Sequence, residues 1–310
     1  MTKKLITDLK MHYYSTTLMG VLKGVADFYG IDISDEWLFG GSGHAFLINI
    51  HEELCPSGPY CWNPETFYKL VKNLGIEIKY LGFYSSKSTL EERRNVEEIL
   101  RKNIDEGVPC SLLNMENQLI SGHDEIHFLV EQPWPKLDFP PSTIFSLEFE
   151  TWRELKDEFH VSFFEFKKTE KACDEKVVQD SLIAALDIVR NPDNWRLEHY
   201  YVGLQAYDAW IEAVKRGFGT THGNWWNGTV WKECRQMASS FFSEIASKYE
   251  DKISKEASKL SDRYMEVAML LDKAREKELD DEEKIDILLK ARKAEESCMC
   301  QIESLLMQFA

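Results

Sequence analysis

The first residues that could do chemistry stand at the start of an amphipathic segment running from Thr16 to Tyr29. Ser15 follows Tyr14 there, so its hydroxyl is expected at the N-terminus of a helix, and Tyr14 beside it is expected to contact a ligand. Such a hydroxyl acts as a nucleophile only beside a base, because the pKa of a free serine is far too high. It also serves as an ordinary N-cap without any reaction. Both roles stay open for Ser15, with His44 or His123 as a base that folding would have to supply.

A glycine-rich turn covers residues 40–44 and reads Gly-Gly-Ser-Gly-His. No lysine follows its glycines, as a phosphate-binding loop would require. Histidine also stands where a nucleophile elbow needs its second glycine. Glycines do let a backbone approach a ligand or a neighbouring strand closely. The turn therefore predicts ligand contacts from Gly41, Ser42, Gly43 and His44.

Two further stretches carry candidate binding residues. In an extended chain, alternation would place His123, Glu125 and His127 on one face, where they could hold a divalent metal. Short polar hairpins are commonly just solvated, so we predict no metal and no cofactor and retain His123 as a ligand contact. Residues 220–231 read as a glycine-bounded loop whose tryptophans are costly to expose. Trp225 and Trp226 are expected either to dock the two halves of the chain or to line a pocket.

Composition excludes two classes of partner. The net charge of −16 over 310 residues argues against nucleic acid, which needs clustered Lys and Arg. No segment approaches the roughly 20 apolar residues of a membrane span, and the N-terminus lacks the apolar stretch of a signal peptide. Seven cysteines, an odd number, are expected as free thiols. These features favour a cytoplasmic protein that binds neither nucleic acid nor membrane.

The pattern of apolar residues changes near residue 170. Residues 1–170 mix short helices with short apolar runs of strand type, which predicts an α+β domain. In residues 171–310 apolar residues recur at spacings of three and four, which is typical of amphipathic helices that pack side by side. Five helices are expected there, the first from Asp174 to Arg190. The predicted architecture is an α+β domain followed by an all-α helical bundle.

Two groups of motifs resemble a known family. Residues 18–31 end in tyrosine-glycine-isoleucine and lead into residues 37–46 with the glycine-rich turn. Gly107-Val108-Pro109-Cys110 and the later Gly122-His123-Asp124-Glu125 form the second group. Over residues 10–168 the chain resembles the N-terminal domain of the butirosin-biosynthesis acyltransferase family, which is related to the cysteine peptidases that process bacteriocin leaders. The resemblance implies a papain-like fold for the first domain.

The family's chemistry requires a thiolate at the N-terminus of the first helix, where the helix dipole lowers the thiol pKa, and a histidine from the sheet. Matched onto this chain, the thiol position falls at Tyr14–Ser15 and the histidine position at Glu116–Asn117. Both look substituted. Ser15, Glu116 and Asn117 are therefore the residues that occupy the family's catalytic positions.

We expect a pseudoenzyme that binds a small molecule, a peptide or an acyl group in a cleft between the two domains, without thiol catalysis. Two alternatives remain. A hydrolase or acyltransferase would use a relocated nucleophile such as Ser15 or Cys55. A structural protein would self-associate through its C-terminal helices, which makes a homo-oligomer possible.

Overall fold

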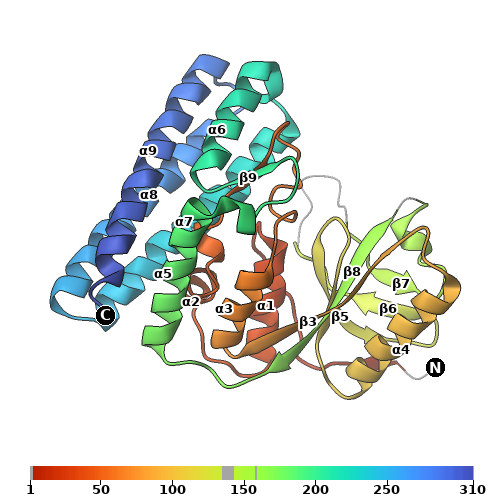
Figure 1. Ribbon diagram of the computed structural model, residues 1–310. Helices are drawn as coiled ribbons and strands as arrows, with labels where there is room; N and C mark the ends of the chain where they lie inside the picture. The colour runs from red at the N-terminus through yellow and green to blue at the C-terminus, as the bar shows by residue number, and fades with distance from the viewer. Residues whose placement is uncertain (1–2, 135–142, 158, 310) are drawn as a thin grey trace. The chain divides into compact units, whose positions relative to one another are not determined.

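The chain folds into two compact units in a computed structural model that describes residues 3–134, 143–157 and 159–309 (Figure 1). Unit 1 comprises residues 1–33 and 75–171, and unit 2 comprises residues 34–74 and 172–310. The chain therefore enters unit 2 twice. The second entry is at Ala172. Residues 34–74, which the sequence placed in the N-terminal domain, group by their contacts with the C-terminal helices.

Unit 1 is built on an antiparallel sheet in which seven strands are described. From one edge to the other the strands are β3 (Ile76–Ser85), β8 (His160–Lys168), β4 (Cys110–Leu113), β5 (Asn117–His123), β6 (His127–Val130) and β7 (Ser146–Glu148), and β1 (Lys4–Leu5) also pairs with β5. The long β3–β8 pair carries a β-bulge between Tyr80 and Gly82, which bends the strand. β4 and β5 form a tight hairpin whose turn holds Glu116, so this turn lies at an end of the sheet.

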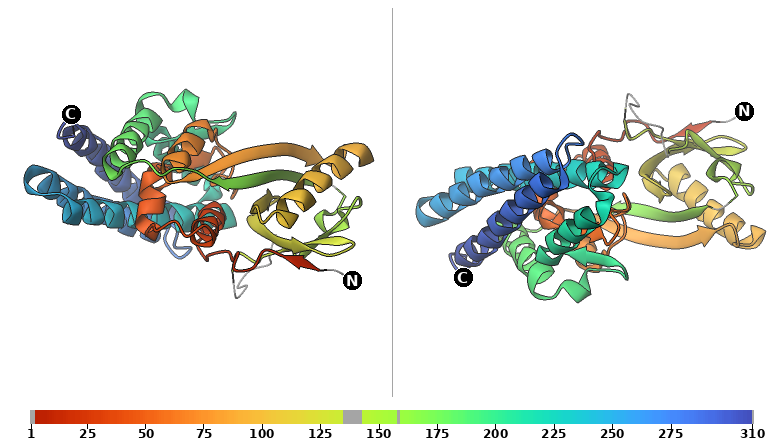
Figure 2. Two further views of the ribbon diagram at one scale, coloured as in Figure 1. Left: turned by 90° about the horizontal axis from the view of Figure 1, so that it is seen from below. Right: turned by 90° about the horizontal axis from the view of Figure 1, so that it is seen from above.

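Helices α1 (Thr17–Phe28) and α4 (Leu90–Asp105) pack on this sheet (Figures 1 and 2). α4 begins with a capping box, in which Thr89 and Glu92 satisfy each other's backbone N–H groups. Val96, Leu100 and Ile104, spaced by four, form its buried stripe. The short 3₁₀ turn η2 (Arg153–Leu155) precedes β8.

Unit 2 is mainly helical. Its first segment contains α2 (Asp35–Gly41), the 3₁₀ turn η1 (His44–Phe46), β2 (Asn49–His51) and α3 (Glu65–Asn73). Its second segment contains α5 (Asp174–Arg190), the 3₁₀ turn η3 (Pro192–Asn194), β9 (Tyr200–Val202), α6 (Leu204–Ala213), the π-helical turn η4 (Val214–Phe218), α7 (His222–Lys248), α8 (Asp251–Ala274) and α9 (Asp281–Leu306). β2 pairs with β9, and α7, α8 and α9 lie side by side (Figures 1 and 2).

A fully buried ion pair crosses the core of unit 2. The Arg235 Nε donates to Glu295 Oε2 at 2.8 Å, and Tyr207 donates its hydroxyl to the same oxygen at 3.0 Å. The Arg235 Nη1 also donates to the carbonyls of Ala45 and Leu47. One guanidinium thereby fastens η1 to α7 and α9, so the early segment of unit 2 is anchored in the bundle.

The expected fold class is confirmed as a mixed N-terminal region with an antiparallel sheet, followed by a C-terminal helical bundle. All five expected helices occur, as α5 to α9. The expected loop at residues 220–231 is wrong, because α7 begins at His222 after the N-cap Thr221. A Cβ at Gly223 would collide with the Leu54 carbonyl, and one at Gly228 with the Arg275 side chain, so these glycines allow close packing rather than a turn. Within the described ranges, no helix combines the length and hydropathy needed to cross a membrane.

Candidate functional site

Residues Lys4–Ser15 form an N-terminal arm of unit 1. This arm runs along α1 and ends at the start of that helix. A Cβ at Gly20 would collide with the His12 carbonyl, and one at Gly24 with the Lys10 carbonyl. The His12 N–H also donates to the Gly20 carbonyl at 3.2 Å. Two glycines spaced by one helical turn thus let the backbone of the arm touch α1, which fixes the side chains that the arm carries.

At the start of α1, residues about a hundred positions apart come together. The Thr17 hydroxyl donates to Glu116 Oε2 at 2.8 Å and accepts from the Asn117 backbone N–H at 3.0 Å. Thr17 is 0% exposed, Asn117 4% and Glu116 8%. The N-terminal end of a helix favours a nearby carboxylate. The start of α1 and the β4–β5 hairpin therefore meet in the structure through Thr17.

This cluster has no means of thiol chemistry. The single cysteine in the sequence of unit 1 is Cys110, on β4, and burial raises the pKa of its thiol to about 12. The Thr17 hydroxyl donates its proton to the Glu116 carboxylate. Because Thr17 is fully buried, a substrate cannot contact this hydroxyl. Ser15 and Tyr14 lie half-buried on the arm, where the Tyr14 carbonyl accepts from the Trp134 indole at 3.1 Å.

A groove of about 710 Å³ runs along the arm, and we call it the arm groove. Residues 5–13 line it together with Ser121 and Glu131. The His12 imidazole is part of this lining, and its Nε2 lies 2.7 Å from Asp27 Oδ2 on α1. The volume falls in the range of pockets that hold small ligands, and the elongated lining suits an extended chain.

His123, at the end of β5, takes part in local bonds. Its Nε2 lies 3.2 Å from Asp105 Oδ1, and its Nδ1 lies 3.1 Å from the Asp124 carbonyl. His127 pairs separately with the Asp124 carboxylate at 3.5 Å. In the part of the chain that the structure describes, no three His, Cys, Asp or Glu side chains converge to hold a metal.

The glycine-rich turn of unit 2 lies in its core. A Cβ at Gly41 would press on Leu74 and Val177, while Gly43 has a φ of 75°, which favours glycine. Ser42 donates its hydroxyl to the Phe39 carbonyl at 3.1 Å. These contacts account for the residues through packing. A ligand contact from Gly41, Ser42 or Gly43 stays a prediction.

His44 is enclosed by aromatic rings and is only 1% exposed. The rings belong to Phe39, Trp62, Phe67 and Trp231. Burial first, and then the positive charge of Arg235, lower the pKa of His44 to about 3. The Cys234 sulfur lies 3.5 Å from its Nδ1. This is a cysteine–histidine contact, but both residues are buried, so a substrate has no access to it.

Trp225 and Trp226 occupy the first turn of α7, and their ring centroids lie 5.9 Å apart. Trp226 is buried, while Trp225 is half-buried and also contacts the His222 ring at 5.4 Å. Their part in binding a ligand stays a prediction.

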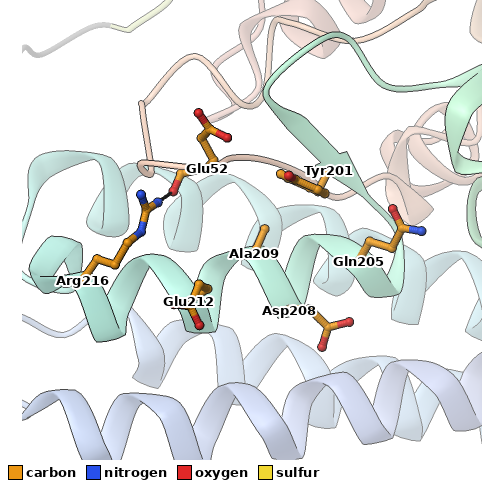
Figure 3. A pocket seen from close by; sticks show the side chains of 7 residues that line it. All are labelled: Glu52, Tyr201, Gln205, Asp208, Ala209, Glu212 and Arg216. Carbon is orange, nitrogen blue, oxygen red and sulfur yellow. Dashed lines mark hydrogen bonds between the residues drawn. The ribbon is translucent and has the colours of Figure 1, made fainter.

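Unit 2 also has a surface pocket of about 500 Å³ over α6 (Figure 3). Glu52, Tyr201, Gln205, Asp208, Ala209, Glu212 and Arg216 line it. The Arg216 side chain reaches across to donate to the Glu52 carbonyl (Figure 3). Asp208 points away from Tyr201 and forms a two-pronged ion pair with Arg292 of α9, at 2.8 and 3.2 Å. Asp208 is therefore paired with a residue outside the pocket lining, and Arg216 with a backbone carbonyl.

Comparisons with known proteins give no family. A scan of the chain against protein-family models and a search of the curated proteins each found no match. The site must accordingly be argued from its own geometry.

Sequence reasoning missed two features of unit 1. Thr17 was overlooked because the helix was expected to start one residue earlier, which directed attention to Ser15. The His12–Asp27 pair joins residues 15 positions apart, and no periodic pattern relates an extended arm to a helix. The available signal was the pair Gly20 and Gly24, whose spacing of four marks a helix face open to close backbone contact.

Proposed function

We propose that unit 1 is a papain-like domain that has lost thiol catalysis and binds a small molecule, a peptide or an acyl group in the arm groove. The observation that carries this proposal is the cluster at the start of α1. Glu116 and Asn117 are the residues that the resemblance matches to the histidine of the butirosin-biosynthesis acyltransferase family, and both bond to Thr17, two residues after the position Tyr14–Ser15 that it matches to the thiol. A cytoplasmic location, and partners other than nucleic acid or membrane, belong to the same proposal.

The physical support for this proposal is that the reactive groups of the cluster are hydrogen-bonded to one another. The Thr17 hydroxyl donates to a buried carboxylate and accepts from both the backbone N–H and the side-chain amide of Asn117, so its proton and both lone pairs are occupied. The arm groove, in contrast, is open and lies on the same unit. Binding without thiol chemistry is the function that this combination favours.

Blocking the arm groove tests the proposal. Ser121 is half-buried in the groove wall, so Ser121→Phe fills the groove. Ser86→Phe is the matched control, because Ser86 is exposed in a turn of the same unit. Native mass spectrometry would follow 1:1 complexes with a C12 fatty acid and with a pool of decapeptides. We expect at least one probe class to bind the parent and the Ser86→Phe protein, and to bind Ser121→Phe at least tenfold more weakly. Equal binding to all three proteins, or no binding, contradicts the proposal.

A structural role is the second candidate, and it rests on exposed apolar side chains of the bundle. Met265 and Met269 lie one turn apart on α8 and are 38% and 68% exposed, and Leu289 on α9 is 50% exposed. Light scattering coupled to size exclusion would detect self-association. A dimer that dissociates in Met269→Lys supports this candidate, and a monomer at all concentrations excludes it.

A further inference from the structure

His12 uses one of its two ring nitrogens to hold a carboxylate of α1. Its Nε2 is bonded to the Asp27 carboxylate at 2.7 Å. Its Nδ1 has no hydrogen-bond partner in the described ranges of the chain, and His12 is one of the residues that line the arm groove. A carboxylate that accepts from Nε2–H fixes the tautomer in which Nδ1 carries a free lone pair. The imidazole is thus prepared to accept a proton from the groove.

Two contacts hold this arrangement in place. The His12 N–H donates to the Gly20 carbonyl, and Gly20 itself allows that close approach. Lys23, one turn before Asp27 on α1, pairs with the other carboxylate oxygen. Although desolvation acts to raise the pKa of Asp27, Lys23 and His12 together lower it, so the carboxylate stays ionised. An oriented base supported by a fixed carboxylate is the arrangement found in acid–base catalysis.

We propose that His12 and Asp27 form a general acid–base dyad that activates water to hydrolyse an acyl ester lying in the arm groove. The inference rests on the proposed binding function of that groove and adds a reaction to it. His12 is the catalytic residue, because it faces the groove, and Asp27 is a positioning residue that acts through His12.

The reaction needs only the ester and water. His12 Nδ1 takes a proton from water as the oxygen forms a bond to the carbonyl carbon, which gives a tetrahedral oxyanion and an imidazolium. The carbon–alkoxy bond then breaks, and the imidazolium returns its proton to the departing alkoxide. The products are a carboxylic acid and an alcohol, and His12 is neutral again. Asp27 stabilises the imidazolium without taking its proton.

The experiment measures hydrolysis of 4-nitrophenyl octanoate by the full chain. His12→Gln removes the base, and we expect the rate to fall about 100-fold, the lower end of acid–base contributions. Asp27→Asn can donate to Nε2 and so favours the other tautomer, which would lower the rate about tenfold. His160→Gln is the matched control, because His160 is an exposed histidine of the same unit outside the groove lining. Its rate is expected to equal that of the parent.

Two readouts separate a catalytic from a structural role. The pH–rate profiles of the parent and His12→Gln should differ, because only the parent carries this base. Binding of N-butyl octanamide, an amide analogue that is not cleaved, is followed in parallel by native mass spectrometry. If parent and His12→Gln both bind the amide but hydrolyse the ester equally, the dyad is refuted while the binding function stands. If neither binds the amide and no His12-dependent hydrolysis occurs, the dyad and acyl binding by the groove are both refuted.

Discussion

The buried His44 makes the stability of unit 2 depend on pH in a calculable way. The pKa of this imidazole is lowered to about 3 in the folded protein, against about 6.5 for an unperturbed histidine. The unfolded chain therefore binds one more proton between these values, and stability falls as pH drops below about 6.5. The loss is about 1.4 kcal/mol for each pH unit, or about 5 kcal/mol when complete near pH 3.

The variant His44→Phe isolates this contribution. Phenylalanine fits an aromatic surrounding and cannot take up a proton, so its free energy of unfolding should lack the His44 part of the acid dependence. Nothing bonded to Nε2 is lost, because this atom has no partner in the described part of the chain. The groups that face the imidazole are the Cys234 thiol and the Arg235 guanidinium, both from α7, and both remain in the variant.

Urea unfolding, followed by far-ultraviolet circular dichroism, provides the assay at pH 7, 6 and 5. We expect the parent to lose about 2 kcal/mol more than His44→Phe between pH 7 and pH 5, whatever the two stabilities at pH 7. His222→Phe is the matched control, because His222 is exposed on the same unit. It should follow the parent. Parallel curves for the parent and His44→Phe would refute the burial of a neutral imidazole.

Three further predictions concern stability in urea. Arg235→Met leaves the Glu295 charge buried without its partner and should cost about 3–5 kcal/mol, and the added change Glu295→Leu should recover part of this loss. Thr17→Val removes the bonds to Glu116 and the Asn117 N–H and should cost about 1–3 kcal/mol, whereas Thr17→Ser keeps the hydroxyl and should cost less than about 1 kcal/mol. Gly223→Ala should destabilise the protein although alanine is the better helix former, because the Leu54 carbonyl occupies the place of the Cβ. A stabilised Gly223→Ala protein, or equal stabilities of the two Thr17 variants, would contradict the contacts described.

Local patterns in the sequence were sufficient for the helices and for much of the sheet. Each helix of the bundle shows its own apolar stripe, so α5 was expected over the same residues that the structure gives it. The capping box of α4, from Thr89 to Glu92, is likewise a property of four consecutive residues. These signals can be read without knowing which part of the chain the helix packs against.

Interactions between distant segments could not be read in the same way. Residues 34–74 join the bundle through buried contacts such as those of Arg235 with the Ala45 and Leu47 carbonyls, which are 190 and 188 positions away. No periodicity connects such segments. Glycines were also ambiguous, because Gly223 signals a turn in the sequence but serves close packing inside α7.

The start of α1 and its last turn carry different reactive side chains, and both proposals depend on this difference. At its start, the buried Thr17 hydroxyl donates to the Glu116 carboxylate, so this hydroxyl is not available as a nucleophile. At its last turn, Asp27 holds an imidazole whose second nitrogen remains open to a groove. A helix C-terminus favours a positive charge, such as the imidazolium formed when His12 accepts a proton. If unit 1 acts on what it binds, it should therefore do so through a base that activates water and not through a covalent intermediate. A mass shift of the protein by an acyl group during turnover would be incompatible with this mechanism.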